Sequence, residues 1–158
     1  MRVKLQNGHP ASEEAMNALE IALGCRLSDS FRTFLRTYDG AKPETNVFRI
    51  NERNESGVNR FIPVREIAKA RTQIENIPSK AYPVAWAEGG NYIFVDEDKD
   101  GAVFFWDHEL PDEPTNLAAD FGSFLELLEP FDVGRIQLKP GQVRKVWVDP
   151  EFRKKIQK

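Results

Sequence analysis

The chain has 158 residues, of which 41% are hydrophobic and 30% are charged, and its formal net charge is -3. The length suits one domain with one hydrophobic core, and no apolar run approaches the ~18 residues that a membrane-spanning helix needs. Because Cys25 is the only cysteine, an internal disulfide, a cysteine-rich zinc site and a C-x-x-C redox pair are excluded.

The charge is unevenly distributed along the chain. Residues 1–129 hold 14 Lys and Arg against 22 Asp and Glu, a net charge of -8, whereas residues 130–158 hold 8 against 3, a net charge of +5. An acidic body repels nucleic-acid backbones and attracts cationic partners, so direct nucleic-acid binding is disfavoured. The N-terminus lacks the apolar segment of a secretory signal, so we expect a soluble, cytoplasmic protein that does not bind membranes.

Two amphipathic helices are predicted near the N-terminus. Ser12 offers a capping hydroxyl to the first helix, and Gly24 supplies its end. Ser28 can cap the second helix, which Asp39-Gly40 terminates. The apolar residues of the second helix recur with helical spacing; they are Phe31, Phe34, Leu35 and Tyr38.

The next part of the chain gives weaker signals. Turn-forming and charged residues dominate 41–57, where we expect a short strand over 47–50 and a mobile loop over 51–57. A strand is predicted over 59–62, and Pro63 suits the first turn of a third helix that ends before Pro78.

Three short runs of aromatic and β-branched residues, at 83–86, 92–96 and 102–106, are separated by Gly-Gly-Asn and Asp-Lys-Asp-Gly turns. This pattern is typical of an antiparallel meander. Asp120 can cap a last helix, which Pro130 closes. Beyond it, Trp147 and Phe152 predict that the basic tail docks onto the body.

An acidic row begins at the end of the second of these strands. Eight carboxylates fall within 18 positions, with Lys99 the only cation among them: Asp96, Glu97, Asp98, Asp100, Asp107, Glu109, Asp112 and Glu113. Like charges repel, and a solvated turn does not need this density, so the row is either a solvated face or a surface that binds a basic partner. Together with Trp86, these acids are our candidate partner-binding residues.

A calcium loop is the competing interpretation of the same row. Residues 96–101 match the opening D-x-D-x-D-G of such loops, and Asp107 falls at the twelfth position. The flanks are strand-like, Asp107 is shorter than the usual Glu, and Phe104 offers no oxygen at the ninth position. An acidic hairpin turn explains these residues better, so no metal site is predicted.

His108 is predicted to have a structural rather than a catalytic or metal-binding role. Alternation along a strand would send Asp107 and Glu109 to one face and His108 to the other, and His9 is the only other histidine. A two-histidine metal site therefore lacks its second half, and we expect His108 to be a hydrogen-bonded structural residue.

Three further motifs fail as catalytic or cofactor sites. Ser123 lacks the G-x-S-x-G nucleophile elbow, and Gly89-Gly90-Asn91 is too short for a phosphate-binding loop. Cys25 follows a helix end beside apolar residues, which indicates burial rather than nucleophilic catalysis. No catalytic residue and no cofactor is predicted.

The second predicted helix, over 27–40, resembles the "L-P-x-x-Y/F-x-x-F-L-x-x-Y/N-G" signature of the SUKH superfamily of fungal cell-wall-regulator-like domains. Later segments are similar to further elements of that family in the same order, and together they span most of 12–128. They are Tyr82-Pro83-Val84-Ala85 with Gly89-Gly90-Asn91, then Gly101-Ala102-Val103-Phe104-Phe105-Trp106-Asp107-His108, then Ala118-Ala119-Asp120-Phe121-Gly122-Ser123-Phe124-Leu125.

The resemblance implies an α+β fold with a central antiparallel sheet, the meander, flanked by helices, and it implies no enzymatic activity. We expect one domain over 1–158, with a core of about 12–128 and a C-terminal extension, 129–158, docked on the body. In bacterial members the resemblance implies an immunity protein that binds and neutralises a cognate toxin, often a nuclease or another nucleic-acid-modifying enzyme.

This implied function suits the charge of the chain, because an acidic surface is steered towards a cationic cleft. We expect the protein to be a monomer or a weak homodimer. Two alternatives stay open: a regulatory scaffold that binds an endogenous protein, and a metal-dependent enzyme that uses the Asp96 to Asp107 loop.

Overall fold

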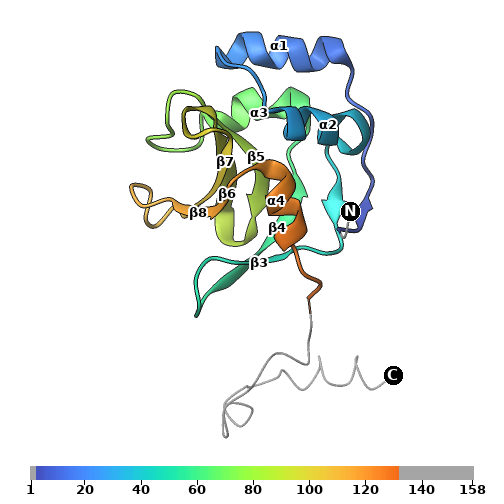
Figure 1. The fold of residues 1–158 in the computed structure, drawn as a ribbon. Helices are drawn as coiled ribbons and strands as arrows, with labels where there is room; N and C mark the ends of the chain where they lie inside the picture. Colours follow the sequence, from blue (N-terminus) through green and yellow to red (C-terminus); the bar gives the residue numbers. More distant parts are fainter. Residues whose placement is uncertain (1–2, 132–158) are drawn as a thin grey trace, which may run out of the picture.

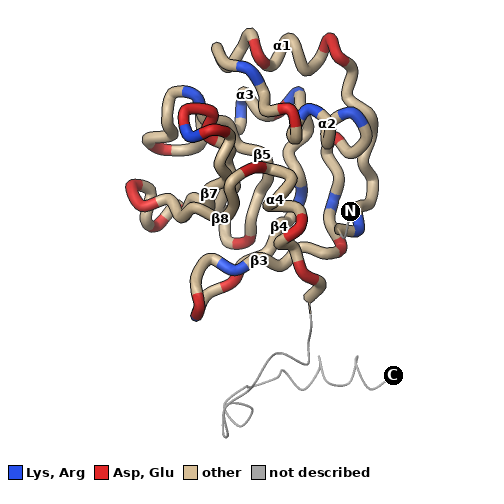
Figure 2. The backbone as a smooth tube through the Cα atoms, in the orientation of Figure 1, with Lys and Arg blue, Asp and Glu red and all other residues tan. Residues whose placement is uncertain are grey.

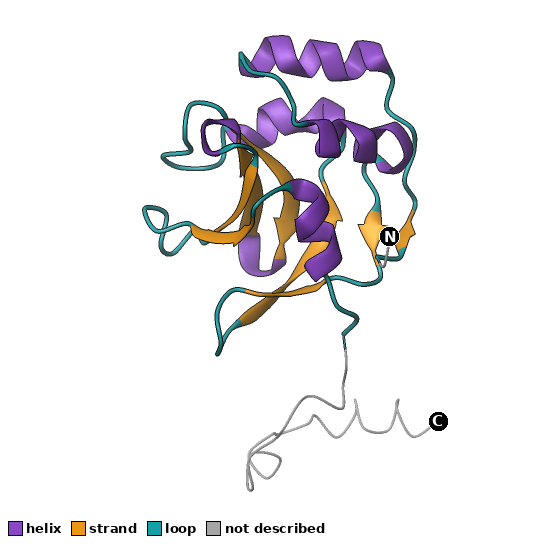
Figure 3. Ribbon diagram, in the orientation of Figure 1, coloured by secondary structure: helices purple, strands orange, loops and turns teal. Residues whose placement is uncertain are grey.

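Six strands form one antiparallel sheet in which neighbours in the chain are also neighbours in space (Figures 1 and 3). A computed structural model describes residues 3–131. From one edge to the other the strands are β3 (Val47–Arg49), β4 (Glu55–Phe61), β5 (Ala81–Ala87), β6 (Asn91–Asp96), β7 (Ala102–Trp106) and β8 (Thr115–Ala118). A separate pair joins β1 (Leu5–Gln6) to β2 (Lys42–Pro43). The predicted meander and the α+β class are confirmed.

The antiparallel order decides which connections lie together. Successive strands run in opposite directions, so the connections alternate between the two ends of the sheet. The connections 50–54, 88–90 and 107–114 therefore share one end. The connection that contains α3 and the turn at 97–101 share the other end, where Figure 1 also shows α1 and α2.

The four helices of the described residues are α1 (Glu13–Leu23), α2 (Asp29–Tyr38), α3 (Val64–Arg71) and α4 (Phe121–Leu127). Ser12 Oγ accepts a hydrogen bond from Ala15 N at 3.0 Å, and Gly24 ends α1 in the left-handed conformation at φ 71°. Asp120 Oδ1 caps α4 by accepting from Ser123 N at 2.7 Å. The expectation for Ser28 is wrong, because its side chain makes no capping hydrogen bond to α2.

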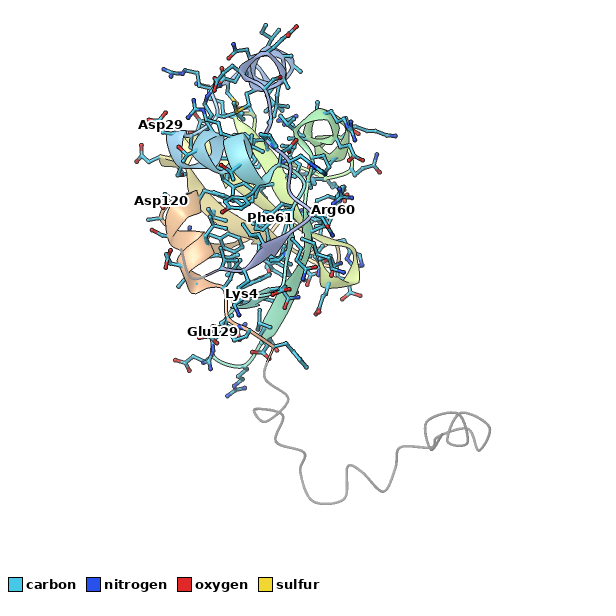
Figure 4. All side chains as sticks on the ribbon, turned by 90° about the vertical axis from the view of Figure 1, so that its right-hand side faces the viewer. Lys4, Asp29, Arg60, Phe61, Asp120 and Glu129 are labelled. Carbon is cyan, nitrogen blue, oxygen red and sulfur yellow. The ribbon has the colours of Figure 1, made fainter. Side chains whose placement is uncertain are left out.

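The main core lies between the helices and one face of the sheet, and aromatic rings fill its centre. The Phe121 ring lies 5.0 Å from the rings of Phe31 and Phe34, and the Phe34 ring lies 4.7 Å from that of Phe61. Figure 4 shows Phe61 in the interior and its neighbour Arg60 at the surface, as alternation along β4 requires. Burial of such rings is the main stabilising contribution.

The sheet curves until it is nearly barrel-shaped. The Phe48 ring of edge strand β3 lies 5.7 Å from the Phe105 ring of β7, so the two sides of the sheet approach each other. The opposite face of β6 and β7 carries a smaller core, in which Phe94 stacks on Phe104 at 5.3 Å and Ile74 covers them.

The structure corrects several strand boundaries. The strand predicted over 59–62 is β4, which begins at Glu55, so 55–57 are paired with β3 rather than part of a loop. Glu, Ser and Gly are weak strand formers, and here pairing at the sheet edge overrides their preference. Strand β8 lacks a strand-like sequence and was not predicted. The predicted docking of the tail, with Trp147 and Phe152, falls on residues beyond 131 and lies outside the described chain.

Among residues 3–131, no helix is long and apolar enough to cross a membrane.

Candidate functional site

The acidic row is divided between the two ends of the sheet. In the register of β6 and β7, Asp96 pairs with Ala102 and Tyr92 pairs with Trp106. Asp96 to Asp100 therefore occupy the turn at one end of β7, and the acids from Asp107 onward follow its other end. The four residue steps of β7 separate them by roughly 13 Å. Figure 2 shows the acidic segments in two separate loops.

The first group of acids is partly committed to building its own turn. Asp96 is only 2% exposed, and its Oδ1 accepts from Asp98 N at 3.0 Å. Glu97 Oε1 accepts a 2.6 Å hydrogen bond from the Tyr82 hydroxyl. Asp98 is exposed and lies 3.7 Å from Lys80 Nζ. Asp98 and Asp100 are the exposed members of this group.

The geometry of this turn differs from that of a calcium loop. Asp107, which would close the loop at the twelfth position, lies at the far end of β7. Asp100 and Gly101 both adopt positive φ, at 57° and 78°, as acidic hairpin turns commonly do. Among residues 3–131, no group of three or more His, Cys, Asp and Glu side chains is arranged to hold a metal ion.

The second group lies in the connection 107–114, and its arrangement corrects the expected alternation. Strand β7 ends at Trp106, so Asp107, His108 and Glu109 form a turn in which Asp107 Oδ1 accepts from Glu109 N at 2.9 Å. His108 Nδ1 lies 2.7 Å from Asn91 Oδ1, which also accepts from His108 N at 3.0 Å. The predicted hydrogen-bonded histidine is confirmed, and it connects this segment to the first residue of β6.

The three connections at this end of the sheet enclose an open groove of about 500 Å³. Its apolar lining comes from Ile50, Phe105 and Leu110, of which Leu110 is 55% exposed. Its acidic lining consists of Glu55, Glu88, Asp107 and Glu113. Among the residues that the structure describes, no Lys or Arg lines it. We call this feature the acidic groove.

Two of its four carboxylates were not among the predicted site residues. Glu55 was assigned to a loop, and Glu88 stands alone before a Gly-Gly turn. Both reach the groove through strand pairing, and no local motif in the sequence could have shown this. The Glu88 side chain lies against Gly57 of β4, and a Cβ at Gly57 would lie 2.9 Å from Glu88 Oε1, so the carboxylate would have to move.

Trp86 belongs to the opposite face of the sheet. It pairs with Tyr92, which pairs with Trp106, and residues that pair directly point to the same face. Phe105, which lines the acidic groove, points to the other face. The predicted site residues thus fall into three places: the 97–101 turn, the groove end, and the outer face at Trp86.

Titratable groups away from the groove have structural roles. Burial, and then the hydrogen bond to Glu97, raise the pKa of Tyr82 far above its ordinary value. Burial, and then the charge of Glu97, raise the pKa of the Cys25 thiol, which makes it a poor nucleophile. Burial also raises the pKa of Asp39, although a hydrogen bond from Val64 N at 2.7 Å acts in the opposite direction.

The model of the SMI1/KNR4 family (SUKH-1) matches residues 10–127, from the segment before α1 to the end of α4. The chain belongs to this family. The match confirms the resemblance seen in the sequence. SUKH-1 domains are generally non-catalytic immunity or regulatory proteins, and the fold described above is consistent with either role. No curated protein matches the chain.

Proposed function

We propose that this SUKH-1 protein is an immunity protein that binds and neutralises a cognate bacterial toxin, a nuclease or another nucleic-acid-modifying enzyme. The acidic groove is the observation that supports the proposal most. Enzymes that act on nucleic acids hold the phosphate backbone in cationic clefts. A groove lined by four carboxylates complements such a cleft and would occupy the path of the phosphates.

The composition of the groove also suits a protein partner. An apolar centre inside a charged rim is the usual anatomy of protein interfaces. Here Ile50, Phe105 and the exposed Leu110 supply the apolar centre, and the carboxylates supply the rim. The function needs tight stoichiometric binding and no catalysis.

We propose the acidic groove as the primary contact, extended by Glu109 and Asp112 of the same connection. Both side chains are exposed. Asp98 and Asp100 at the other end of β7, and Trp86 on the outer face, are secondary candidates. Asp96 and Glu97 hold the 97–101 turn together and support it from within.

The test begins with the product of the neighbouring toxin gene, produced as an inactive variant. Association rates are measured by surface plasmon resonance at several salt concentrations. The variant Glu55→Gln/Glu88→Gln/Glu113→Gln should slow association by about tenfold and flatten its salt dependence, because steering depends on local charge.

A matched control separates the groove from net charge. Glu14, Glu66 and Glu75 are exposed acids on or beside α1 and α3. The variant Glu14→Gln/Glu66→Gln/Glu75→Gln changes the net charge equally and should leave association nearly unchanged. Equal slowing in both variants would remove the groove as the contact surface.

A regulatory scaffold for an endogenous protein is the second candidate, because a basic segment of any protein would suit the same groove. The two functions differ in their partner. The scaffold would be favoured if the neighbouring gene product did not bind and a basic protein encoded elsewhere in the genome bound through the groove.

A further inference from the structure

The described chain stops shortly after a bridge to β3, the strand that leads into the acidic groove. Glu129 N donates to Val47 O at 2.8 Å, and Val47 N donates to Glu129 O at 2.9 Å, so the chain after α4 is fastened to β3. Figure 4 shows Glu129 close to the end of the described chain. Ile50, just past the end of β3, lines the groove and lies three residues beyond Val47, roughly 10 Å away. Because the bridge is antiparallel, the described chain leaves Glu129 in the direction away from Ile50, and it stops within roughly 20 Å of that residue.

The remaining segment has the composition that the groove complements. Residues 132–158 carry 8 Lys and Arg against 3 Asp and Glu, a net charge of +5, and they include Trp147 and Phe152. Cations can meet the four carboxylates of the lining, while an aromatic side chain can cover Ile50 and the exposed Leu110.

Covalent attachment makes even a weak contact effective. A segment of 27 residues spans up to roughly 90 Å when extended, so every part of the groove is within reach. Attachment through the same chain gives an effective concentration on the order of millimolar. A partner present at a lower concentration must compete with the tethered segment for the groove.

We propose that the basic segment 132–158 binds in the acidic groove of its own chain and competes there with a cationic partner. The binding of the segment stands on its charge and its reach alone, whereas its regulatory consequence rests on the proposed function. A partner must displace the segment, which limits the groove to partners that bind it more strongly than the tethered segment does.

Zero-length carbodiimide coupling of the full chain, followed by mass spectrometry of the monomer, tests the binding. We expect Lys139, Lys145 or Lys154 to couple to Glu55, Glu88 or Glu113. Coupling to acids outside the groove, or no coupling at all, overturns the proposal. A mixture of isotopically labelled and unlabelled protein identifies coupling between two copies, which would overturn the assignment to one chain.

Limited trypsin digestion gives an independent readout that does not need the carboxylates as reactants. A bound segment is protected, so cleavage within 132–158 should be about tenfold faster in the Glu55→Gln/Glu88→Gln/Glu113→Gln variant than in the wild type. The Glu14→Gln/Glu66→Gln/Glu75→Gln control should be cleaved at the wild-type rate. Equal rates in all three proteins overturn the proposal.

The regulatory consequence is tested with Arg144→Gln/Lys145→Gln/Lys154→Gln, which leaves the groove intact. The apparent affinity for the toxin should rise by about two- to tenfold, because it scales with the fraction of open grooves. If the segment couples to the groove but toxin binding ignores the groove acids, the groove fails as the toxin contact and segment binding stands; if the toxin does not bind at all, the proposed function fails and segment binding still stands. If the groove acids govern toxin binding but the segment is neither coupled nor protected, only this inference fails.

Discussion

Replacing Tyr82 with phenylalanine removes one hydroxyl that connects three parts of the fold. Tyr82 lies on β5 and is fully buried at 0% exposure. Its hydroxyl donates to Glu97 Oε1 at 2.6 Å, and it accepts from Ser28 N at 3.1 Å. Ser28 immediately precedes α2, and Glu97 belongs to the turn between β6 and β7.

The expected loss follows from these two hydrogen bonds. A hydrogen bond to a charged group contributes about 1.5–3 kcal/mol, and a neutral one contributes about 0.5–1.5 kcal/mol. Glu97 and Ser28 are each half-buried, so water replaces part of what the hydroxyl supplied. We expect the free energy of unfolding to fall by about 2–3 kcal/mol at pH 7.

The same substitution should change the response to alkaline pH. Burial and the bond to Glu97 raise the pKa of Tyr82 in the folded protein above the ordinary value of 10.0. Above pH 10 the unfolded chain therefore releases a proton that the folded chain retains. Stability contributed by Tyr82 is fully present below pH 10 and declines above it by about 1.4 kcal/mol per pH unit.

Urea unfolding followed by circular dichroism at pH 7, 9 and 10.5 measures both effects. Tyr82→Phe should be less stable than wild type at pH 7 and 9, and the difference should narrow at pH 10.5. Tyr92→Phe, at a partly exposed tyrosine, is the matched control and should stay within about 0.5 kcal/mol of wild type. Equal stability at pH 7, or a difference that stays constant to pH 10.5, would refute the reasoning.

Two further substitution pairs test the core and the backbone. Phe121→Ala should lower the free energy of unfolding by about 3–5 kcal/mol, because its ring is fully buried among other rings, whereas Leu127→Ala, on the same helix but 50% exposed, should cost far less. Similar losses of unfolding free energy in the two variants, measured by urea unfolding, would contradict the assigned core. Gly101→Ala should cost about 1–2 kcal/mol because φ is 78°. Gly122→Ala should stabilise α4 by about 0.5–1 kcal/mol, because its Cβ would meet nothing closer than 3.5 Å. A lower melting temperature than that of the wild type would count against this.

Local signals in the sequence predicted the helices and the meander well. Ser12, Gly24 and Asp120 act within a few residues of the helix ends that they define, so their chemistry is readable without tertiary structure. Pairing at the sheet edge is not local. Glu55 sits in a strand because β3 lies beside it, and a weak strand former gives no sign of that.

The sequence predicted that the candidate site would be acidic, but it did not predict which of the acids would lie together. The sequence places eight acids in one row, and an acidic surface on the sheet is present. Because β7 runs through the row, half of it is carried to the opposite end of the sheet. Glu88 joins Asp107 and Glu113 instead, since an antiparallel ladder brings alternate connections together irrespective of their separation in sequence.

The acidic groove is lined mainly by connections between strands, whereas paired strands and helices hold the fold together. Each of the three segments around the groove is a hairpin link whose ends are already held by paired strands, so changes in its length or charge cost the scaffold little. Under the proposed function, a new toxin specificity can therefore arise largely by exchanging these links, while the aromatic centre and the helices keep the same sequence.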